Sequence, residues 1–413
     1  MTTTQSTTST DQALRARARG VIPGGMYGHM SMGPMPPSYP QFMARGEGAR
    51  LWDVDGREYV DLMCGWGTIV LGRQHQEVDA AVAAQLGNGD CLNGPGPVMV
   101  DLAELLVETI PSADWSMFAK NGTDATTMSV TIARAATGRR RVLMANGAYH
   151  GAAPWCTPGP SGVLPEDRAF IDKFDYNDVE SLRAAVAAAG DDLAAIIVSP
   201  VRQDNRRDQE LALPEFAREV RELATSSGAV LILDDVRCGF RLDVRGSWEP
   251  LGIRPDLTAW SKAIANGHPL AAVTGIDSLA EAASSIYTTG SFWFAPTAMA
   301  AAITTVTLLR DTDAMAHTHR MAQLMRDGIE EQARRHGLEI RQSGPAAMPL
   351  VLFEGDTDLS TVASWADECV SRGVYLHPWH NWFYTAAHQP EDIAWALERT
   401  DDAFAAVAAR RTA

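Results

Sequence analysis

The feature that most constrains how this 413-residue chain folds is an alternation of short apolar segments with helix-like segments, from about residue 100 to residue 310. Three of the helix-like runs are 98–110, 180–190 and 214–228. The apolar segments that resemble strands are 116–120, 141–146, 193–200, 229–236, 257–262 and 270–275. Such alternation is typical of a mainly parallel sheet covered by helices on both faces, so the predicted fold class is α/β.

Charge and cysteine content indicate which classes of binding partner and which redox setting to expect for this chain. A formal net charge of −16 argues against nucleic acid and against an anionic membrane surface as partners. The five cysteines show neither paired metal spacing nor a short disulfide framework, so we expect a reduced, cytoplasmic setting. No apolar run is long enough to span a membrane, and the polar start lacks the apolar core of a signal peptide.

One lysine, Lys262, stands among small and apolar residues in the stretch LTAWSKAIANGHPLAAVTG. Burying an unpaired ammonium is costly, so this lysine either ends a strand and points to water or is held for chemistry. Asp234 ends the apolar strand before it, where a carboxylate can also simply cap the next turn. Gly122 and Thr123 lie where a strand meets a helix, which suits a phosphate but is also an ordinary helix start.

Taken together, these three features match what pyridoxal phosphate requires. A lysine with a lowered pKa forms an imine with the cofactor and shuttles protons. A carboxylate keeps the pyridine nitrogen protonated, so that the ring accepts electrons. Amides at a helix start hold the phosphate.

The chain resembles the class III, fold-type I pyridoxal-phosphate aminotransferases, especially the branch of glutamate-1-semialdehyde aminomutase. The motifs that carry the resemblance include LWDVDGREYVDL, KNGTDA, GAYHG, DDVRCGFR and PDLTAWSKAIANGHPLAAVTG. The resemblance implies a large domain with a mainly parallel seven-stranded sheet and a smaller α/β domain. We expect a disordered tail over 1–15, an N-terminal segment over 16–70 that packs with the small domain, the large domain over 71–310 and the small domain over 311–413.

The resemblance also implies roles for particular residues. Lys262 is similar to the imine lysine, and Asp234 to the partner of the pyridinium nitrogen. Val236, Tyr149 and His150 would contact the ring, and Asp204 or Asn205 would lie near its hydroxyl. Phosphate contacts would come from Gly122 and Thr123, and from Gly290 and Ser291 of the second copy in a homodimer.

Departures from the aminomutase pattern concern the substrate. After IPGG the aminomutases carry an arginine that binds the substrate carboxylate, but this chain reads MYGHMSMG, with Ser31 near that position. Arg241 is an alternative residue for binding an anionic group of the substrate. No His or Cys pair has the helical spacing of a zinc site, so no metal is expected. The candidates for substrate binding are His29, Trp66, Arg237, His377, His380 and Trp382. The aromatic residues among them could equally belong to the core or to a dimer interface, and each histidine could be structural.

We therefore expect a pyridoxal-phosphate-dependent aminotransferase that moves an amino group between an amino donor and a keto acceptor. The aromatic candidates favour a cyclic or aromatic substrate of secondary metabolism. The alternatives are a glutamate-1-semialdehyde-type aminomutase, a racemase, a lyase, and an enzyme that aminates a cyclic keto acid and aromatises it to an aminobenzoate. A regulatory protein that binds pyridoxal phosphate without turnover is the alternative outside the enzymes.

Overall fold

The computed structural model describes residues 9–204 and 206–412. The contacts within the chain divide it into two compact units. Unit 2 consists of Gly65–Leu71 and His75–His317, and unit 1 contains the chain up to Cys64, Gly72–Gln74 and the chain from Thr318 onward. The domain boundaries expected from the sequence, at residues 70 and 310, remain predictions.

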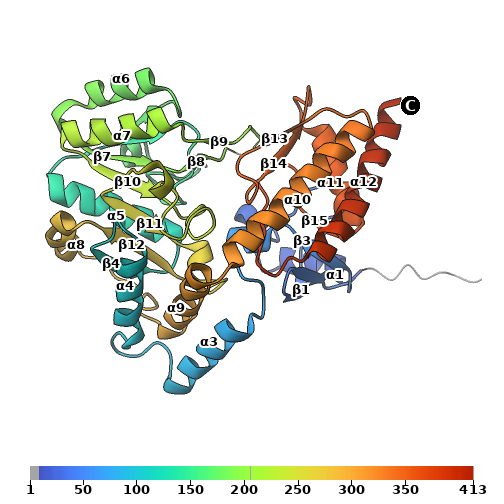
Figure 1. Cartoon of the computed structure of the whole chain (residues 1–413), viewed down its shortest axis with the longest axis horizontal. Coiled ribbons are helices and arrows are strands. Elements are labelled where there is room, and N and C mark those ends of the chain that lie inside the picture. Colours follow the sequence, from blue (N-terminus) through green and yellow to red (C-terminus); the bar gives the residue numbers. More distant parts are fainter. Residues whose placement is uncertain (1–8, 205, 413) are drawn as a thin grey trace, which may run out of the picture. The chain divides into compact units, whose positions relative to one another are not determined.

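A seven-stranded sheet forms the centre of unit 2 (Figure 1). Its order is β4-β12-β11-β10-β7-β5-β6, and only β12 runs antiparallel to its neighbours. This confirms the predicted α/β class and the mainly parallel sheet. The strands are β4 (Trp115–Ala119), β5 (Arg141–Ala145), β6 (Ile171–Phe174), β7 (Leu193–Val198), β10 (Val230–Asp234), β11 (Leu257–Trp260) and β12 (Ala271–Gly275).

Six of these strands coincide with the apolar segments found in the sequence, and β6 does not. Strands β7 and β10 are buried at every position, as central strands of a sheet with two covered faces must be. At the edge of the sheet, β6 reads Ile-Asp-Lys-Phe, and only Phe174 is fully buried. An edge strand with two charged residues has no continuous apolar run, which is why the sequence did not reveal it.

Helices cover both faces of this sheet (Figure 1). On one face, α6 and α7 bury Leu182, Phe216 and Val220 against β5, β7 and β10. On the other face, α5 and α8 bury Ile132, Ala133 and Ala283. The bounds of these helices are α5 (Gly122–Thr137), α6 (Val179–Ala189), α7 (Pro214–Ser227) and α8 (Ala280–Ser285).

The remaining elements of unit 2 lie before, between and after the sheet strands in the chain. Helix α9 (Pro296–Asp311) packs against α3 (Gln76–Asn88) and α4 (Val98–Thr109). The short helix α2 (Cys64–Gly67) lies where the chain passes between the units, and β8 (Val201–Arg202) pairs with β9 (Glu210–Leu211). Single 3-10 turns are η2 (Pro165–Arg168), η3 (Gly190–Asp192), η4 (Glu249–Leu251), η5 (Lys262–Ala265) and η6 (Asp277–Leu279).

Unit 1 combines strands from the start of the chain with helices from its end. The turn around Asp-Val-Asp-Gly joins the antiparallel pair β2–β3, and the sheet order is β1-β2-β3-β15. A second hairpin is formed by β13 and β14. The strands are β1 (Met43–Glu47), β2 (Arg50–Asp53), β3 (Glu58–Asp61), β13 (Ile340–Ser343), β14 (Leu350–Phe353) and β15 (Val374–Tyr375). The helical segments are α1 (Thr10–Arg19), η1 (Gly28–Met30), α10 (Ala314–Arg335, which begins in unit 2), α11 (Ser360–Ser371) and α12 (Pro390–Thr412).

The predicted disordered tail was too long. Helix α1 begins at Thr10, so residues 10–15 are helical, while residues 1–8 lie outside the described part of the chain. The Ser9 side chain accepts a hydrogen bond from the Gln12 amide and caps this helix. Asp11 in its first turn accepts hydrogen bonds from the amides of Gln41 and Phe42 at 2.8 and 3.0 Å. These contacts tie the helix to unit 1, which a reading of local composition does not detect.

Among the helices in the described part of the chain, none combines the length and the apolar character needed to cross a bilayer.

Candidate active site

The carboxyl ends of the parallel strands in unit 2 bring the principal candidates to one edge of the sheet. Strands β10 and β11 are neighbours, and Asp234 pairs in register with Ala259. Lys262 follows the end of β11 after one residue, Ser261. Ligands of open α/β sheets bind outside this edge, so the geometry favours the functional reading of both residues.

Lys262 is held in an uncommon backbone conformation. It has φ of 51° and opens the turn η5, whose other residues, Ala263–Ala265, are buried. The Ser261 hydroxyl donates to the Leu270 carbonyl at 2.9 Å, which links the two ends of this loop. A lysine with positive φ costs energy, and such outliers concentrate at functional sites.

Burial lowers the pKa of Lys262 to about 8, with the Arg237 guanidinium as the next cause in size and the Asp234 carboxylate acting in the opposite direction. A desolvated ammonium loses hydration energy, and a nearby cation repels it further. A substantial part of the lysine is therefore a neutral amine near pH 8. A neutral amine is the form that attacks a carbonyl carbon.

Asp234 has a histidine as its direct partner. Its Oδ2 lies 2.6 Å from Nδ1 of His150, and its Oδ1 accepts from the Val236 amide at 3.2 Å. Both side chains are buried, Asp234 at 6% exposure and His150 at 2%. Within the described residues, Nε2 of His150 has no hydrogen-bond partner. The pair holds the carboxylate in one orientation at the end of β10.

The neighbouring acid, Asp235, points into a different environment. Its Oδ2 accepts from the Ser247 amide at 2.9 Å and its Oδ1 from the Ser247 hydroxyl at 2.6 Å. Burial, which is complete, raises the pKa of Asp235 to about 7. Because successive side chains of a strand point to opposite faces, only one of the two acids can face the same space as His150.

The start of α5 provides two unpaired backbone amides. Asn121 caps the helix by accepting from the Asp124 amide at 3.2 Å. In the described part of the chain, the amides of Gly122 and Thr123 donate to no other residue. Unpaired amides at the start of a 16-residue helix attract an anion such as phosphate.

The segment after β5 packs closely on the start of α5. The Thr126 hydroxyl donates to the His150 carbonyl at 2.6 Å, and the Ala152 amide donates to the Thr123 hydroxyl at 3.1 Å. A Cβ at Gly151 would lie 2.6 Å from Oγ1 of Thr123, so this position needs glycine. Thr126 was not identified from the sequence, although its place one helical turn after Gly122 was a possible signal.

Val236 and Gly122 are in direct contact. A Cβ at Gly122 would lie 2.6 Å from Cγ1 of Val236, so the glycine allows the valine to approach the start of α5. Tyr149, two residues before Gly151, is 46% exposed and is available to a ligand. The structure therefore brings Gly122, Val236, Asp234 and His150 together through direct contacts between their atoms.

Asp204 packs against the segment that follows β5, next to Gly147. A Cβ at Gly147 would lie 2.5 Å from Oδ2 of Asp204, and Oδ1 of Asp204 has no partner within the described residues. Arg202 and Arg207 approach the carboxylate at 3.9 and 3.8 Å. The other candidate for the ring hydroxyl, Asn205, lies outside the described residues.

Gly290 and Ser291 belong to an exposed turn of unit 2. The Trp293 amide donates to the Gly290 carbonyl at 2.9 Å, and a Cβ at Gly290 would lie 2.2 Å from Nε1 of the Trp293 ring. Large apolar side chains around this turn are open to solvent, with Tyr287 94% and Phe292 64% exposed.

The predicted substrate-binding residues are divided between the units. Trp66 and Arg237 belong to unit 2 and are half-buried, whereas His29, His377, His380 and Trp382 belong to unit 1. Trp382 is 1% exposed and stacks on Trp365 with ring centroids 5.8 Å apart. Burial lowers the pKa of His377 to about 4, so its ring is neutral at pH 7. The burial of Trp382 and His377 fits the alternative that these two residues are structural.

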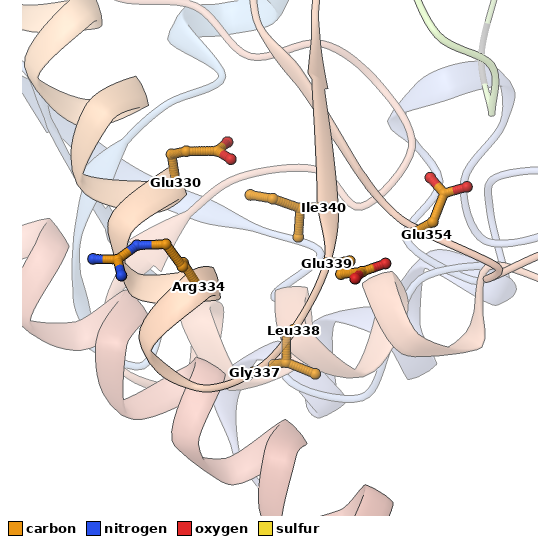
Figure 2. A pocket seen from close by; sticks show the side chains of 7 residues that line it. All are labelled: Glu330, Arg334, Gly337, Leu338, Glu339, Ile340 and Glu354. Atoms are coloured by element: carbon orange, nitrogen blue, oxygen red, sulfur yellow. The ribbon is translucent and has the colours of Figure 1, made fainter.

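A cavity of about 600 Å³ lies elsewhere, in unit 1 (Figure 2). Its lining includes the charged side chains of Glu330, Arg334, Glu339 and Glu354, and none of the residues predicted for the site. Within the described residues, no group of three or more His, Cys, Asp or Glu side chains is placed to hold a metal ion.

Comparison with known proteins identifies the family. Residues 34–403 match the family model described as aminotransferase class-III. This chain is a class-III aminotransferase. Enzymes of this class use pyridoxal phosphate to transfer an amino group between an amino donor and a keto acceptor, and the buried carboxylate, the lysine of lowered pKa and the unpaired amides fit that cofactor.

Individual relatives align with this aminotransferase over almost its whole length. It is 47% identical over 394 residues to the aminopentol aminotransferase of Sphingopyxis macrogoltabida, with 95% of this chain and 93% of the relative covered. It is 31% identical to the glutamate-1-semialdehyde 2,1-aminomutase of Desulfatibacillum aliphaticivorans, with 94% and 97% covered. Among solved structures, the pyridoxal-phosphate form of the FumI protein of Sphingopyxis sp. MTA144 matches with a TM-score of 0.97 and 46% identity, covering 98% and 97%.

Proposed function

We propose that Lys262 forms the covalent bond to pyridoxal phosphate and that Asp234 is the partner of its pyridine nitrogen. The observation that carries the proposal is the placement of both residues at the ends of the neighbouring parallel strands β10 and β11, with Asp234 held by His150. The bound cofactor supplies an electron sink for the substrate carbon that bears the amino group. Val236 and Tyr149 would contact the ring, and Asp204 or Asn205 would lie near its hydroxyl.

The chain's own residues supply the remaining chemistry. Lys262 would serve as the proton carrier beside the substrate carbon once it is released from the cofactor, because its lowered pKa makes the neutral amine available near neutral pH. Asp234 stays oriented through Oδ2 by His150 and through Oδ1 by the Val236 amide. The amides of Gly122 and Thr123 would bind the phosphate at the start of α5.

We infer a homodimer in which Gly290 and Ser291 of the second copy reach the phosphate. The exposure of Tyr287 and Phe292 beside this turn supports the inference, because large exposed apolar groups mark association surfaces. Sedimentation tests it, since an active monomer at assay concentration would contradict it. All five cysteines are free, which supports the proposal of a cytoplasmic setting.

For the substrate, we propose an amine without a carboxylate next to the amino group. The missing arginine after IPGG supports this, because a free carboxylate normally needs a charge-assisted anchor. The relative at 47% identity acts, by its name, on an aminopentol, which is a polyhydroxylated amine. The finer assignment to the aminomutase branch has weaker support, at 31% identity. Preference for a cyclic or aromatic substrate stays a prediction, and so does the aminobenzoate alternative.

Two experiments test these assignments. Borohydride reduction of the cofactor-loaded protein, followed by peptide mass spectrometry, is expected to find the cofactor on the peptide that contains Lys262. A label on another lysine contradicts the assignment. A panel containing a polyhydroxylated amine, ring-bearing amines and glutamate-1-semialdehyde is then compared by kcat/KM. A clear preference for the semialdehyde would refute the substrate proposal and favour the aminomutase.

A further inference from the structure

The segment Gly65–Leu71 clusters with unit 2, although the residues on both sides of it belong to unit 1. Its first three residues have left-handed backbone, with φ of 61° at Gly65, 60° at Trp66 and 83° at Gly67. A tryptophan in this region is an outlier that persists only where surrounding contacts hold it. The contacts of this segment therefore decide where the Trp66 ring is presented.

One anchor of the segment is a buried arginine. Arg241 is 1% exposed, and its Nη2 donates to the carbonyls of Gly67 at 3.0 Å and Ile69 at 3.2 Å. The Thr68 hydroxyl closes the turn by donating to the Gly65 carbonyl at 2.9 Å. These bonds fix the carbonyl groups of the segment.

The second anchor comes from the turn that carries Lys262. Oδ1 of Asn266 accepts from the amides of Val70 at 3.0 Å and Leu71 at 2.9 Å, and Asn266 is 7% exposed. Next to it, a Cβ at Gly267 would lie only 2.5 Å from Cδ1 of Ile69. The turn and the segment are thus in direct contact.

Asn266 also ends the turn η5 that begins at Lys262. Its backbone is left-handed, with φ of 44° and ψ of 48°, and its amide bonds to the Ala263 carbonyl at 3.4 Å. Asparagine and glycine are the residues that adopt this conformation most readily. Glycine would serve the backbone equally well, so what asparagine adds at this position is the side-chain oxygen that holds Val70 and Leu71.

We propose that Asn266 is a positioning residue for transamination, which ties the lysine turn to the segment Gly65–Leu71 and thereby fixes Trp66 as a wall of the substrate pocket. The inference rests on the proposed function, because it takes Lys262 as the cofactor-bound amine and Trp66 as a substrate contact. Asn266 acts through these two residues.

The structure indicates which kinetic constant should change. Asn266→Gly keeps the left-handed turn but leaves two buried amides without their acceptor, which loosens the segment. Lys262 itself remains held by the turn and by the bond from Ser261 to Leu270. We expect the KM for the amino donor to rise by about tenfold while kcat changes by less than about twofold.

Asn266→Asp and Asn177→Gly are the matched variants. Asn266→Asp retains an oxygen acceptor and should restore KM to within about threefold of the original. Asn177 has φ of 62°, and its side-chain oxygen accepts from the Leu213 amide at 2.9 Å, far along the chain from the lysine turn. Asn177→Gly makes the same change in the same backbone conformation, and it should leave KM unchanged.

A double-mutant cycle tests whether Asn266 acts through Trp66. In a Trp66→Ala background, Asn266→Gly should raise KM by less than about twofold further, because the group it positions is gone. Additive effects would overturn the proposal. So would an unchanged KM in Asn266→Gly, or an equal fall of kcat in Asn266→Gly and Asn266→Asp.

Failure of this inference is distinguishable from failure of the proposed function. Borohydride labelling reports the site of the cofactor bond independently of KM. Labelling of Lys262 in Asn266→Gly together with an unchanged KM refutes the positioning role alone. Labelling of another lysine in the unaltered protein refutes the proposed function itself.

Discussion

The carboxyl edge of the sheet in unit 2 and the segment 377–384 of unit 1 hold their polar residues in different ways. At the sheet edge, Asp234 and Lys262 lie at the ends of neighbouring parallel strands, and each interacts with a charged or titratable group. In the segment, Trp382 is packed against Trp365, and the neutral ring of His377 is buried. The sheet edge thus brings titratable groups of distant segments together, whereas the segment 377–384 packs its rings into the core of unit 1.

The largest expected effect is at the sheet edge. Lys262→Ala should lower turnover on the order of a thousandfold or more, because no other group is proposed to form the covalent bond or move the proton. Steady-state assays of the variant with saturating cofactor measure this, with circular dichroism as the control for folding. Retention of substantial activity by a folded, cofactor-loaded variant would contradict the proposed role of Lys262.

The two acids of β10 give the next effect. Asp234→Ala should lower kcat on the order of a hundredfold, because the pyridine nitrogen loses its charged partner. Asp235→Ala should mainly lower stability, since Asp235 holds the Ser247 loop through two hydrogen bonds. Parallel kcat and thermal unfolding measurements separate the roles, and equal losses of kcat would contradict them.

Trp382→Ala tests whether the segment 377–384 has a structural role. Removing a fully buried tryptophan from the core of unit 1 should cost about 3–5 kcal/mol of unfolding free energy. Measured at a temperature where the variant is folded, KM should stay within about twofold of the original. Urea unfolding and steady-state kinetics are the two measurements. A large rise in KM with little loss of stability would restore Trp382 as a substrate residue.

The smallest effect concerns pH and His377. Its folded pKa of about 4 lies below the usual 6.5, so the unfolded chain takes up this proton first as pH falls. His377 therefore costs no stability above about pH 6.5 and lowers stability progressively between about pH 6.5 and 4. His377→Gln should lose less stability than the original protein between pH 7.5 and 5 in urea unfolding. An unchanged or steeper loss would show that the ring is not held neutral.

The candidate site could be proposed from the sequence because its residues lie at or just after the ends of apolar strands. Asp234 ends the buried strand β10, Lys262 comes two residues after the buried strand β11, and α5 begins just after β4. The carboxyl ends of parallel strands meet at one edge of the sheet. The contact between His150 and Asp234 was not predictable in this form, because 84 residues separate them in the chain. That His150 faces or flanks the ring stays a prediction, beside the contact of its Nδ1 with the Asp234 carboxylate.

By itself, the sequence determined the α/β class, the positions of six strands along the chain and the family, because periodicity and local motifs depend on near neighbours in the chain. Only the tertiary structure decided that Asp235 faces Ser247, that β6 completes the sheet and that Asn266 holds Val70 and Leu71. Each of these depends on a contact between distant segments. Burial and hydrogen-bond geometry arise from packing the whole chain, which no local pattern contains.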